Sequence, residues 1–177
     1  MIRHITDEGI VIRRFNRQEA DRQLIIFTKN HGKISATAKG VRRPGSKKAG
    51  HLELFSHVQV ELVNTHGYLT ITQAASITTF PCLSSQLPLT RQAFIATEVL
   101  DRFTVFEENY TDLFLHYLEF LKRTNQADPA STDSHLSAFE VHLLQSLGFG
   151  LPETINPFTL KAFIESILDH PLRSTKV

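Results

Sequence analysis

The chain has 177 residues, of which 41% are hydrophobic and 21% charged, and its formal net charge is +1. These values are typical of an ordinary globular protein with one large or two small domains. No apolar run is long enough for a membrane span or a signal core, so we expect a cytoplasmic protein with no membrane partner. The single cysteine, Cys82, excludes an internal disulfide and any zinc site built on paired cysteines.

The small net charge conceals an uneven distribution along the chain. Residues 1–80 contain twelve Lys and Arg against six Asp and Glu, whereas residues 81–177 contain seven against twelve. A basic front half followed by an acidic back half suggests two modules with different partners. We therefore predict one domain at residues 1–80 and a second at residues 81–177.

The first module has the two-residue hydrophobic period of β-strands. The pattern predicts five short strands, at residues 10–15, 23–28, 33–39, 58–63 and 68–74. Turns containing Asn and Gly close two hairpins, at residues 29–32 and 64–67. An SH3-like barrel also has five strands, but the long connection between the third and fourth strands favours an OB-fold barrel, a class that binds oligonucleotides.

The long connection is the most basic stretch of the chain. Residues 39–50 contain five cations, no acid, and Gly and Pro residues that exclude a packed strand or a stable helix. A solvated loop kept for solubility is one interpretation. The other is a mobile phosphate-binding surface, in which the cations are Lys39, Arg42, Arg43, Lys47 and Lys48.

Other residues of the first module are further candidates for nucleic-acid contacts. Phe15 and Tyr68 stand beside polar neighbours and are candidates for stacking on bases, whereas Phe27 has apolar neighbours and is expected in the core. Arg13, Arg14 and Lys33 are additional cations on the predicted strands. They define the alternative phosphate-binding surface if the loop is only a solvated turn.

The second module is predicted to be all helical, so the fold class is α+β. Apolar residues recur at helical spacing over four segments, which begin at Leu87, near Leu113, near Leu136 and at Pro157. Asn156 is a candidate cap for the last helix, and Ser137 with Glu140 could form a capping box near the start of the third. The third helix is expected to end at Gly148.

The sequence contains no pattern that indicates an enzyme. It has no nucleophile elbow, no glycine-rich phosphate loop with its lysine and no His-Glu-x-x-His. The nine histidines are scattered, without partners at a recognisable metal-ligand spacing. We therefore predict no catalytic residue, no metal and no cofactor.

With these features in place, the chain resembles the RecO family of bacterial recombination and repair proteins. The segments that carry the resemblance are 8–12, 28–34, 38–44 continuing to 54–55, 147–149 and 171–174, and Lys39-Gly40-Val41-Arg42-Arg43 is the most specific. The resemblance implies an OB domain followed by helices and binding of single- and double-stranded DNA. It also implies annealing of complementary strands. The expected partners are RecR and the single-strand DNA-binding protein, with which the protein would load RecA, and the expected location is the nucleoid.

One departure from the family pattern is plain. Members commonly carry a four-cysteine zinc module after the Gly-Phe stretch, but this sequence passes from Gly150 to Asn156 without a cysteine. Two other functions stay open from the residues alone. The barrel could bind RNA, since recognition of a 2′-hydroxyl leaves no trace in the sequence, or the acidic helical half could act as a scaffold that the basic loop merely docks.

Overall fold

The computed structural model describes residues 3–128 and 132–174. The chain forms two compact units, and these are interleaved in the sequence. The first comprises residues 1–79 and 106–114, and the second comprises residues 80–105 and 115–177. Within the described residues, none of the helices has the length and apolar character that crossing a membrane requires.

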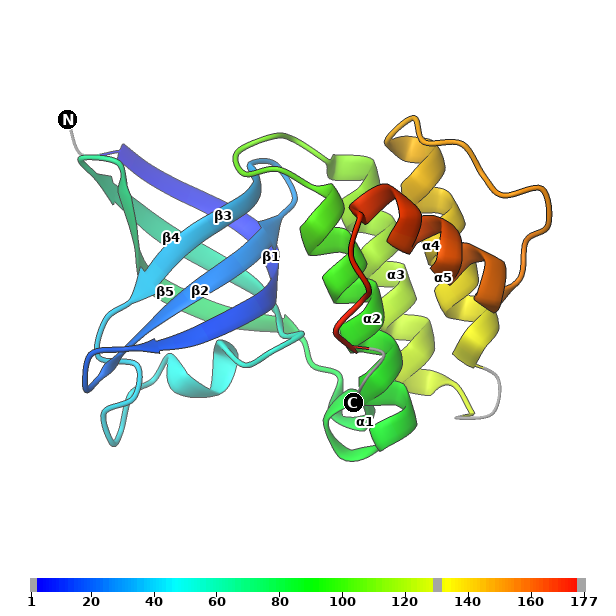
Figure 1. Ribbon diagram of the computed structural model, residues 1–177. Coiled ribbons are helices and arrows are strands. Elements are labelled where there is room, and N and C mark those ends of the chain that lie inside the picture. Colours follow the sequence, from blue (N-terminus) through cyan, green and yellow to red (C-terminus); the bar gives the residue numbers. More distant parts are fainter. Residues whose placement is uncertain (1–2, 129–131, 175–177) are drawn as a thin grey trace. The chain divides into compact units, whose positions relative to one another are not determined.

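The first unit contains a closed five-stranded barrel (Figure 1). The strands are β1 (Arg3–Arg17), β2 (Asp21–Thr28), β3 (Gly32–Ala38), β4 (His57–Thr65) and β5 (Tyr68–Thr78). They are hydrogen-bonded in the order β1-β2-β3-β5-β4, and β4 pairs back with β1. The β3–β5 pair is parallel and the others are antiparallel. The predicted OB-fold barrel followed by helices is confirmed.

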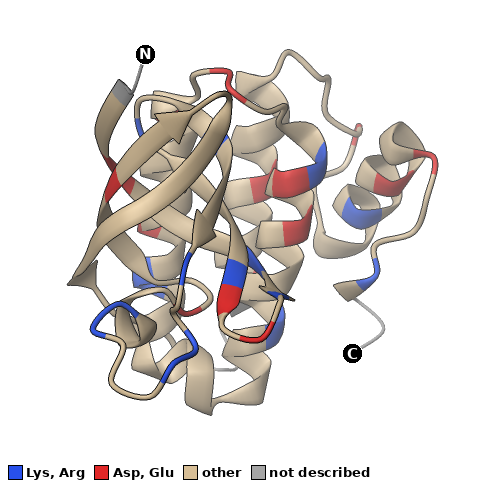
Figure 2. Ribbon diagram, turned by 90° about the vertical axis from the view of Figure 1, so that its left-hand side faces the viewer, with Lys and Arg blue, Asp and Glu red and all other residues tan. Residues whose placement is uncertain are grey.

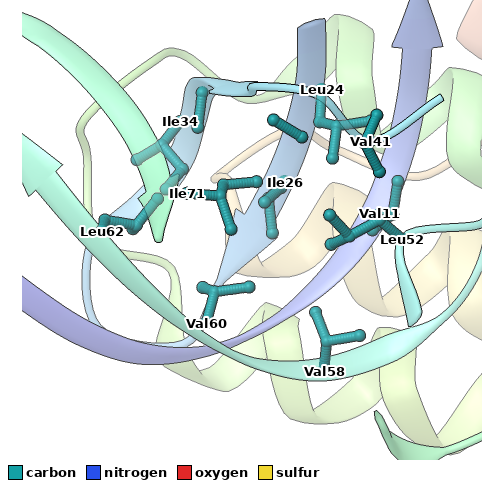
Figure 3. Packing of buried hydrophobic residues seen from close by; sticks show 12 residues of the cluster. Val11, Leu24, Ile26, Ile34, Val41, Leu52, Val58, Val60, Leu62 and Ile71 are labelled. Carbon is teal, nitrogen blue, oxygen red and sulfur yellow. The ribbon is translucent and has the colours of Figure 1, made fainter. Parts of the chain in front are cut away.

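Alternate residues of the strands fill the barrel (Figure 3). Leu24 and Ile26 of β2 point into the same core as Ile34 and Ala36 of β3, and each is at most 4% exposed. Because the side-chain period of a strand is two, the residues between them point outward. This alternation separates the core-facing side chains of β2 and β3 from those on the outside of the barrel.

The β3–β4 connection closes one end of the barrel. Val41, Leu52 and Phe55 are buried, and the first two belong to the barrel core. The 3₁₀-helix η1 (Ala49–His51) lies between them, and His51 Nδ1 lies 2.8 Å from Ser76 Oγ on β5. The connection is therefore held to the barrel at several points, even though Lys39, Arg42, Arg43 and Lys47 are exposed.

Residues 106–114 complete the first unit at the β2–β3 hairpin. The Glu107 amide donates to the carbonyl oxygen of Lys33 at 3.0 Å, and Thr111 Oγ1 donates to that of Lys29 at 2.8 Å. Phe114 packs on the outer side of the barrel, with its ring centre 6.2 Å from that of Phe27. The outward face of β2 is thus apolar and covered at this end.

The second unit consists of helices (Figure 1). They are α1 (Pro81–Ser85), α2 (Leu87–Phe103), α3 (Thr111–Gln126), α4 (Thr132–Ser146) and α5 (Pro157–Leu168), and the first turn of α3 lies in the first unit. Tyr117 of α3 is fully buried, and its hydroxyl lies 2.6 Å from Thr97 Oγ1 of α2. Its ring centre is 5.6 Å from that of Phe139 in α4. A shared aromatic core therefore joins these three helices.

Two predictions about helix ends have different outcomes. Asn156 caps α5, because its side chain accepts hydrogen bonds from the amides of Phe158 and Thr159, both at 3.0 Å. The capping box at Ser137 and Glu140 is wrong: α4 begins at Thr132, so both residues lie inside the helix. The short helix α1 and the 3₁₀-helix η1 were not predicted.

Candidate nucleic-acid interface

The outward face of β1, β2, β3 and β5 carries the exposed side chains of the barrel. The strand registers place Phe15 opposite Gln23, Gln23 opposite Thr37, and Thr37 beside Thr70. Residues paired across neighbouring strands project from the same side of a sheet. These four residues therefore form one row across four strands. Here we call the surface around this row the outer face.

Gln23 sits at the centre of the outer face and links three strands. Its Nε2 donates to Ser35 Oγ at 2.8 Å, while its Oε1 accepts from Thr37 Oγ1 at 2.8 Å and from Arg17 at 3.1 Å. This amide fixes the side chains around it without any buried charge. The result is a polar platform whose side chains are held in place by hydrogen bonds.

Exposed aromatic residues stand at the two sides of this platform. Phe15 on β1 is 45% exposed, and the Arg13 guanidinium lies over its ring at 4.9 Å from the centroid. Tyr68, 75% exposed, precedes Leu69, which pairs with Ala36 of β3. Phe15 stands in the row on β1, and Tyr68 stands on β5 two residues before Thr70, so the two rings lie at separate places on the outer surface of the barrel. They can therefore stack on two different bases of one strand.

The predicted basic loop begins where the outer face ends. Asp21 pairs with Arg17 at the start of β2. The next residue of β2, Arg22, pairs with Ala38 at the end of β3, so Lys39, which follows Ala38, lies next to Asp21. The Gly40 amide donates to Asp21 Oδ1 at 2.8 Å, which ties the loop to the β1–β2 turn. The loop cations thus continue the outer face at one end of the barrel, where Figure 2 shows Lys and Arg gathered.

An open hollow of about 620 Å³ lies where the loop meets this turn. Its lining contains both charges, and its residues are Gln18, Glu19, Ala20, Asp21, Lys39, Gly40 and Arg43. Asp21 accepts from the Gly40 amide through one carboxylate oxygen, so the hollow presents acceptors as well as cations. The hollow can therefore take a group with donors as well as a phosphate, such as a base edge.

A second cluster of cations shares a single acid. Glu53 accepts from Arg22 at 2.9 Å and also forms an ion pair with Arg14. The predicted DNA-binding residue Arg14 therefore also makes an ion pair within the protein. Burial and the positive charges of Arg14 and Arg42 lower the pKa of Arg22 below its ordinary value. Three guanidinium groups thus lie close enough to repel one another. An added phosphate would relieve this repulsion.

The remaining predicted residues differ in how available they are. Lys39, Arg42, Arg43 and Lys47 are exposed, whereas Lys48 is half-buried and donates to the carbonyl oxygen of Ile71 at 3.1 Å. Lys33 is only 4% exposed, and its ammonium lies over the Phe106 ring at 4.8 Å, next to residues 106–114. Of the ten predicted residues, Lys33 is thus the least accessible to a ligand.

Sequence reasoning did not single out three residues of this surface. Arg17 lies on the same side of β1 as Arg13 and Phe15, and the two-residue period alone could have found it. Gln23 and Arg22 could not have been found in this way. Their roles depend on Ser35, Thr37 and Glu53, which are distant in the sequence.

The strand order, the outer face and the basic loop define the chain as an OB-fold protein with a cationic and aromatic surface of the type that contacts oligonucleotides. Comparison with known families gives a specific assignment. Residues 1–80 match the family described as Recombination protein O N terminal, and residues 90–154 match Recombination protein O C terminal. The chain belongs to the RecO family of DNA repair proteins.

Several curated relatives are named DNA repair protein RecO. Those of Symbiobacterium thermophilum and Roseiflexus sp. are 33% and 34% identical over 80% of this chain, and they match over 56% and 49% of their own lengths. That of Dehalococcoides mccartyi strain 195 is 35% identical over 80% of this chain and 55% of its own. The chain thus spans about half the length of the relatives it matches.

Proposed function

We propose that this protein binds single- and double-stranded DNA through the outer face and the basic loop, and that it anneals complementary strands. One observation carries this inference: exposed cations, a polar platform and two exposed aromatic rings are presented on the outward side of the strands and on the loop that follows β3. Cations neutralise phosphates of any sequence, and aromatic rings stack on any base. Such a surface suits a protein that must coat DNA without reading its sequence.

Annealing follows from how such a surface holds a strand. Phosphates on the basic loop and bases on the outer face keep a strand extended, and the neutralised backbone lets a second strand approach. No bond is made or broken in this process, so we infer that the protein acts without catalysing a reaction. Its partners in RecA loading would be RecR and the single-strand DNA-binding protein, and its location would be the nucleoid.

Fluorescence anisotropy with a labelled single-stranded oligonucleotide tests the binding step. We expect affinity to fall linearly in log–log form with rising salt, and a DNA competitor to displace the probe at least as well as an RNA of the same sequence. Mixing two complementary labelled strands with and without protein tests annealing by energy transfer. A strong preference for RNA would favour the RNA-binding alternative, and absence of binding at low salt would contradict the proposal.

A further inference from the structure

Glu53, in the connection between β3 and β4, holds two arginines of the barrel at once. Its Oε1 accepts from Arg22 at 2.9 Å and its Oε2 pairs with Arg14, so one carboxylate bridges two guanidinium groups. The register of β1 and β2 explains why the two arginines meet. Arg14 pairs with Leu24, which is two residues beyond Arg22, so the arginines are diagonal neighbours on one side of the sheet.

The cluster carries more positive charge than Glu53 neutralises. The Arg42 amide donates to the carbonyl oxygen of Ala20 at 2.9 Å, which places Arg42 beside the start of β2 and brings its charge near Arg22. Arg22 gives Glu53 one N–H, and its Nε–H is buried with no hydrogen-bond partner among the described residues. A guanidinium presents its donors as a fork, which two oxygens of one acid match best. One carboxylate shared by several arginines therefore leaves this cluster incompletely satisfied.

We propose, building on the DNA binding proposed above, that Arg14, Arg22 and Arg42 form a site for one phosphodiester group of DNA. Glu53 occupies this site in the free protein and competes with the phosphate. A phosphodiester carries one negative charge on two free oxygens, as a carboxylate does, so it can bridge the same two arginines. The side chains of Arg14 and Glu53 are 38% and 46% exposed, so a DNA strand can reach them. Because Arg14 directly precedes Phe15 in β1, a strand that stacks on the outer face passes close to the site.

The backbone of Glu53 is fixed, whereas its side chain has room to turn away. Leu52, just before it, is buried in the barrel core, and the carbonyl oxygen of Glu53 accepts from the Ser56 amide at 3.1 Å. The Phe55 amide donates to the carbonyl oxygen of Val11 at 2.8 Å, which ties the same turn to β1. A bound strand can therefore displace the carboxylate by rotation of one side chain, without moving the connection.

Glu53→Gln in the full chain tests the site by a gain of affinity. Glutamine keeps an oxygen for Arg22 but not the negative charge, so the arginines become available to phosphate. With a labelled single-stranded oligonucleotide, we expect affinity at low salt to rise at least about fivefold and the magnitude of the log K–log salt slope to rise by about 0.7, as for one more phosphate. Glu61→Gln is the matched control, because it removes the same charge from an exposed position of β4. Its effect should be much smaller, since solvent and salt screen an exposed charge that lies outside the site.

A double-mutant cycle links the gain of affinity to the arginines. The gain from Glu53→Gln should shrink in an Arg14→Ala background, because the two side chains act on the same phosphate. Glu53→Ser is a second variant that removes the charge, and it should bind DNA more tightly than the wild type as well. Thermal melts of all variants separate changes in binding from changes in folding.

Two kinds of failure can be told apart. If the wild type binds DNA and both Glu53 variants keep its affinity and salt slope, the phosphate site is overturned while the proposed function stands. Additive effects of Glu53→Gln and Arg14→Ala would also overturn the site. Absence of DNA binding by the wild type and by both Glu53 variants would contradict the proposed function, and the phosphate site with it.

Discussion

A Cβ atom built on Gly32 would lie 1.7 Å from the carbonyl oxygen of Glu108. Gly32 has φ +63°, and it begins β3 directly under the segment 106–114. The absence of a side chain thus lets a distant part of the sequence reach the β2–β3 hairpin. Residues 106–114 belong to the barrel unit because of this contact and the hydrogen bonds around it.

Gly32→Ala should destabilise the protein strongly. The left-handed backbone alone costs an alanine about 1–2 kcal/mol, and the clash with Glu108 adds to this. Gly67→Ala is the matched control, since Gly67 has φ +86° but no atom within 4 Å of the added Cβ. Urea unfolding should show a clearly larger loss for Gly32→Ala. Equal losses in both variants would mean that the Glu108 contact contributes nothing.

Replacing loop cations should change the salt dependence of DNA binding. Arg43 and Lys47 are exposed, and no described residue forms an ion pair with them. If each neutralises one phosphate, Arg43→Ala/Lys47→Ala lowers the magnitude of the log K–log salt slope by about 1.4 on a single strand. Affinity should fall alike for all sequences, because phosphate contacts carry no base information.

A variant with the same change in net charge serves as control for that slope. Lys122→Ala/Lys161→Ala removes two cations from the helical unit and should leave the slope as in the wild type. Both double variants should melt close to the wild type, since Arg43, Lys47 and Lys122 are exposed and Lys161 is half-buried, and surface charges usually alter stability by less than about 0.5 kcal/mol. If the loop variant keeps the full slope, the loop is a solvated turn. The phosphates would then be held around Arg13, Arg14 and Arg17.

Removing the aromatic rings should weaken binding in a different way. Phe15→Ala and Tyr68→Ala each remove a stacking surface, which is worth about 1–3 kcal/mol per base. The salt slope should stay constant, because no charge is lost. Phe158→Ala, at an 80% exposed position on α5, is the control and should bind as the wild type. Anisotropy titrations at three salt concentrations measure both quantities, and wild-type affinity in both ring variants would remove the outer face from the interface.

Asp7 should make the barrel sensitive to acid. Its carboxylate is buried, which by itself raises its pKa, but hydrogen bonds from His31, Asn30 and two backbone amides outweigh burial and lower the pKa from its ordinary value of 3.8. Because the pKa of Asp7 is lower in the folded protein than in the unfolded chain, the ionised carboxylate stabilises the fold at pH values above the unfolded-state pKa. This contribution is lost as the pH falls below about 3.8. Asp7→Asn should therefore cost about 2–3 kcal/mol at pH 7 and less at pH 3. Denaturant unfolding at both pH values measures the difference, with the exposed Glu61→Gln as control.

Glu140 should have the opposite effect. It is 3% exposed within α4, and burial raises its pKa from 4.5 to about 7. As the pH rises, the Glu140 carboxyl ionises in the unfolded chain before it ionises in the folded protein. Its contribution to the free energy of unfolding is therefore full below pH 4.5 and is lost as the pH rises through 7. Glu140→Gln should thus gain stability relative to the wild type between pH 5 and pH 8, by an amount on the order of a few kcal/mol. A difference independent of pH would show that Glu140 is ionised in the folded state.

Periodic features of the sequence predicted the barrel and the helices well. Alternation of inward residues such as Leu24 and Ile26 determines which face of a strand is buried, so a local pattern was sufficient. The same local reasoning failed for Ser137 and Glu140, where a capping motif occurs by chance inside a longer helix. Contacts that join distant segments had no local signal at all: Glu53 with Arg22, Gly32 with Glu108, and His116 with His142.

The return of residues 106–114 to the barrel also sets an order of events during synthesis. Domains generally fold as they emerge from the ribosome, N-terminal first, at about 5–20 residues per second. Here all five strands emerge before α2, yet the apolar outer side of Phe27 stays uncovered until Phe114 has been made. The nascent barrel must therefore wait several seconds for its last segment. During that interval the exposed strand surface is open to chaperones and to mispairing with neighbouring chains.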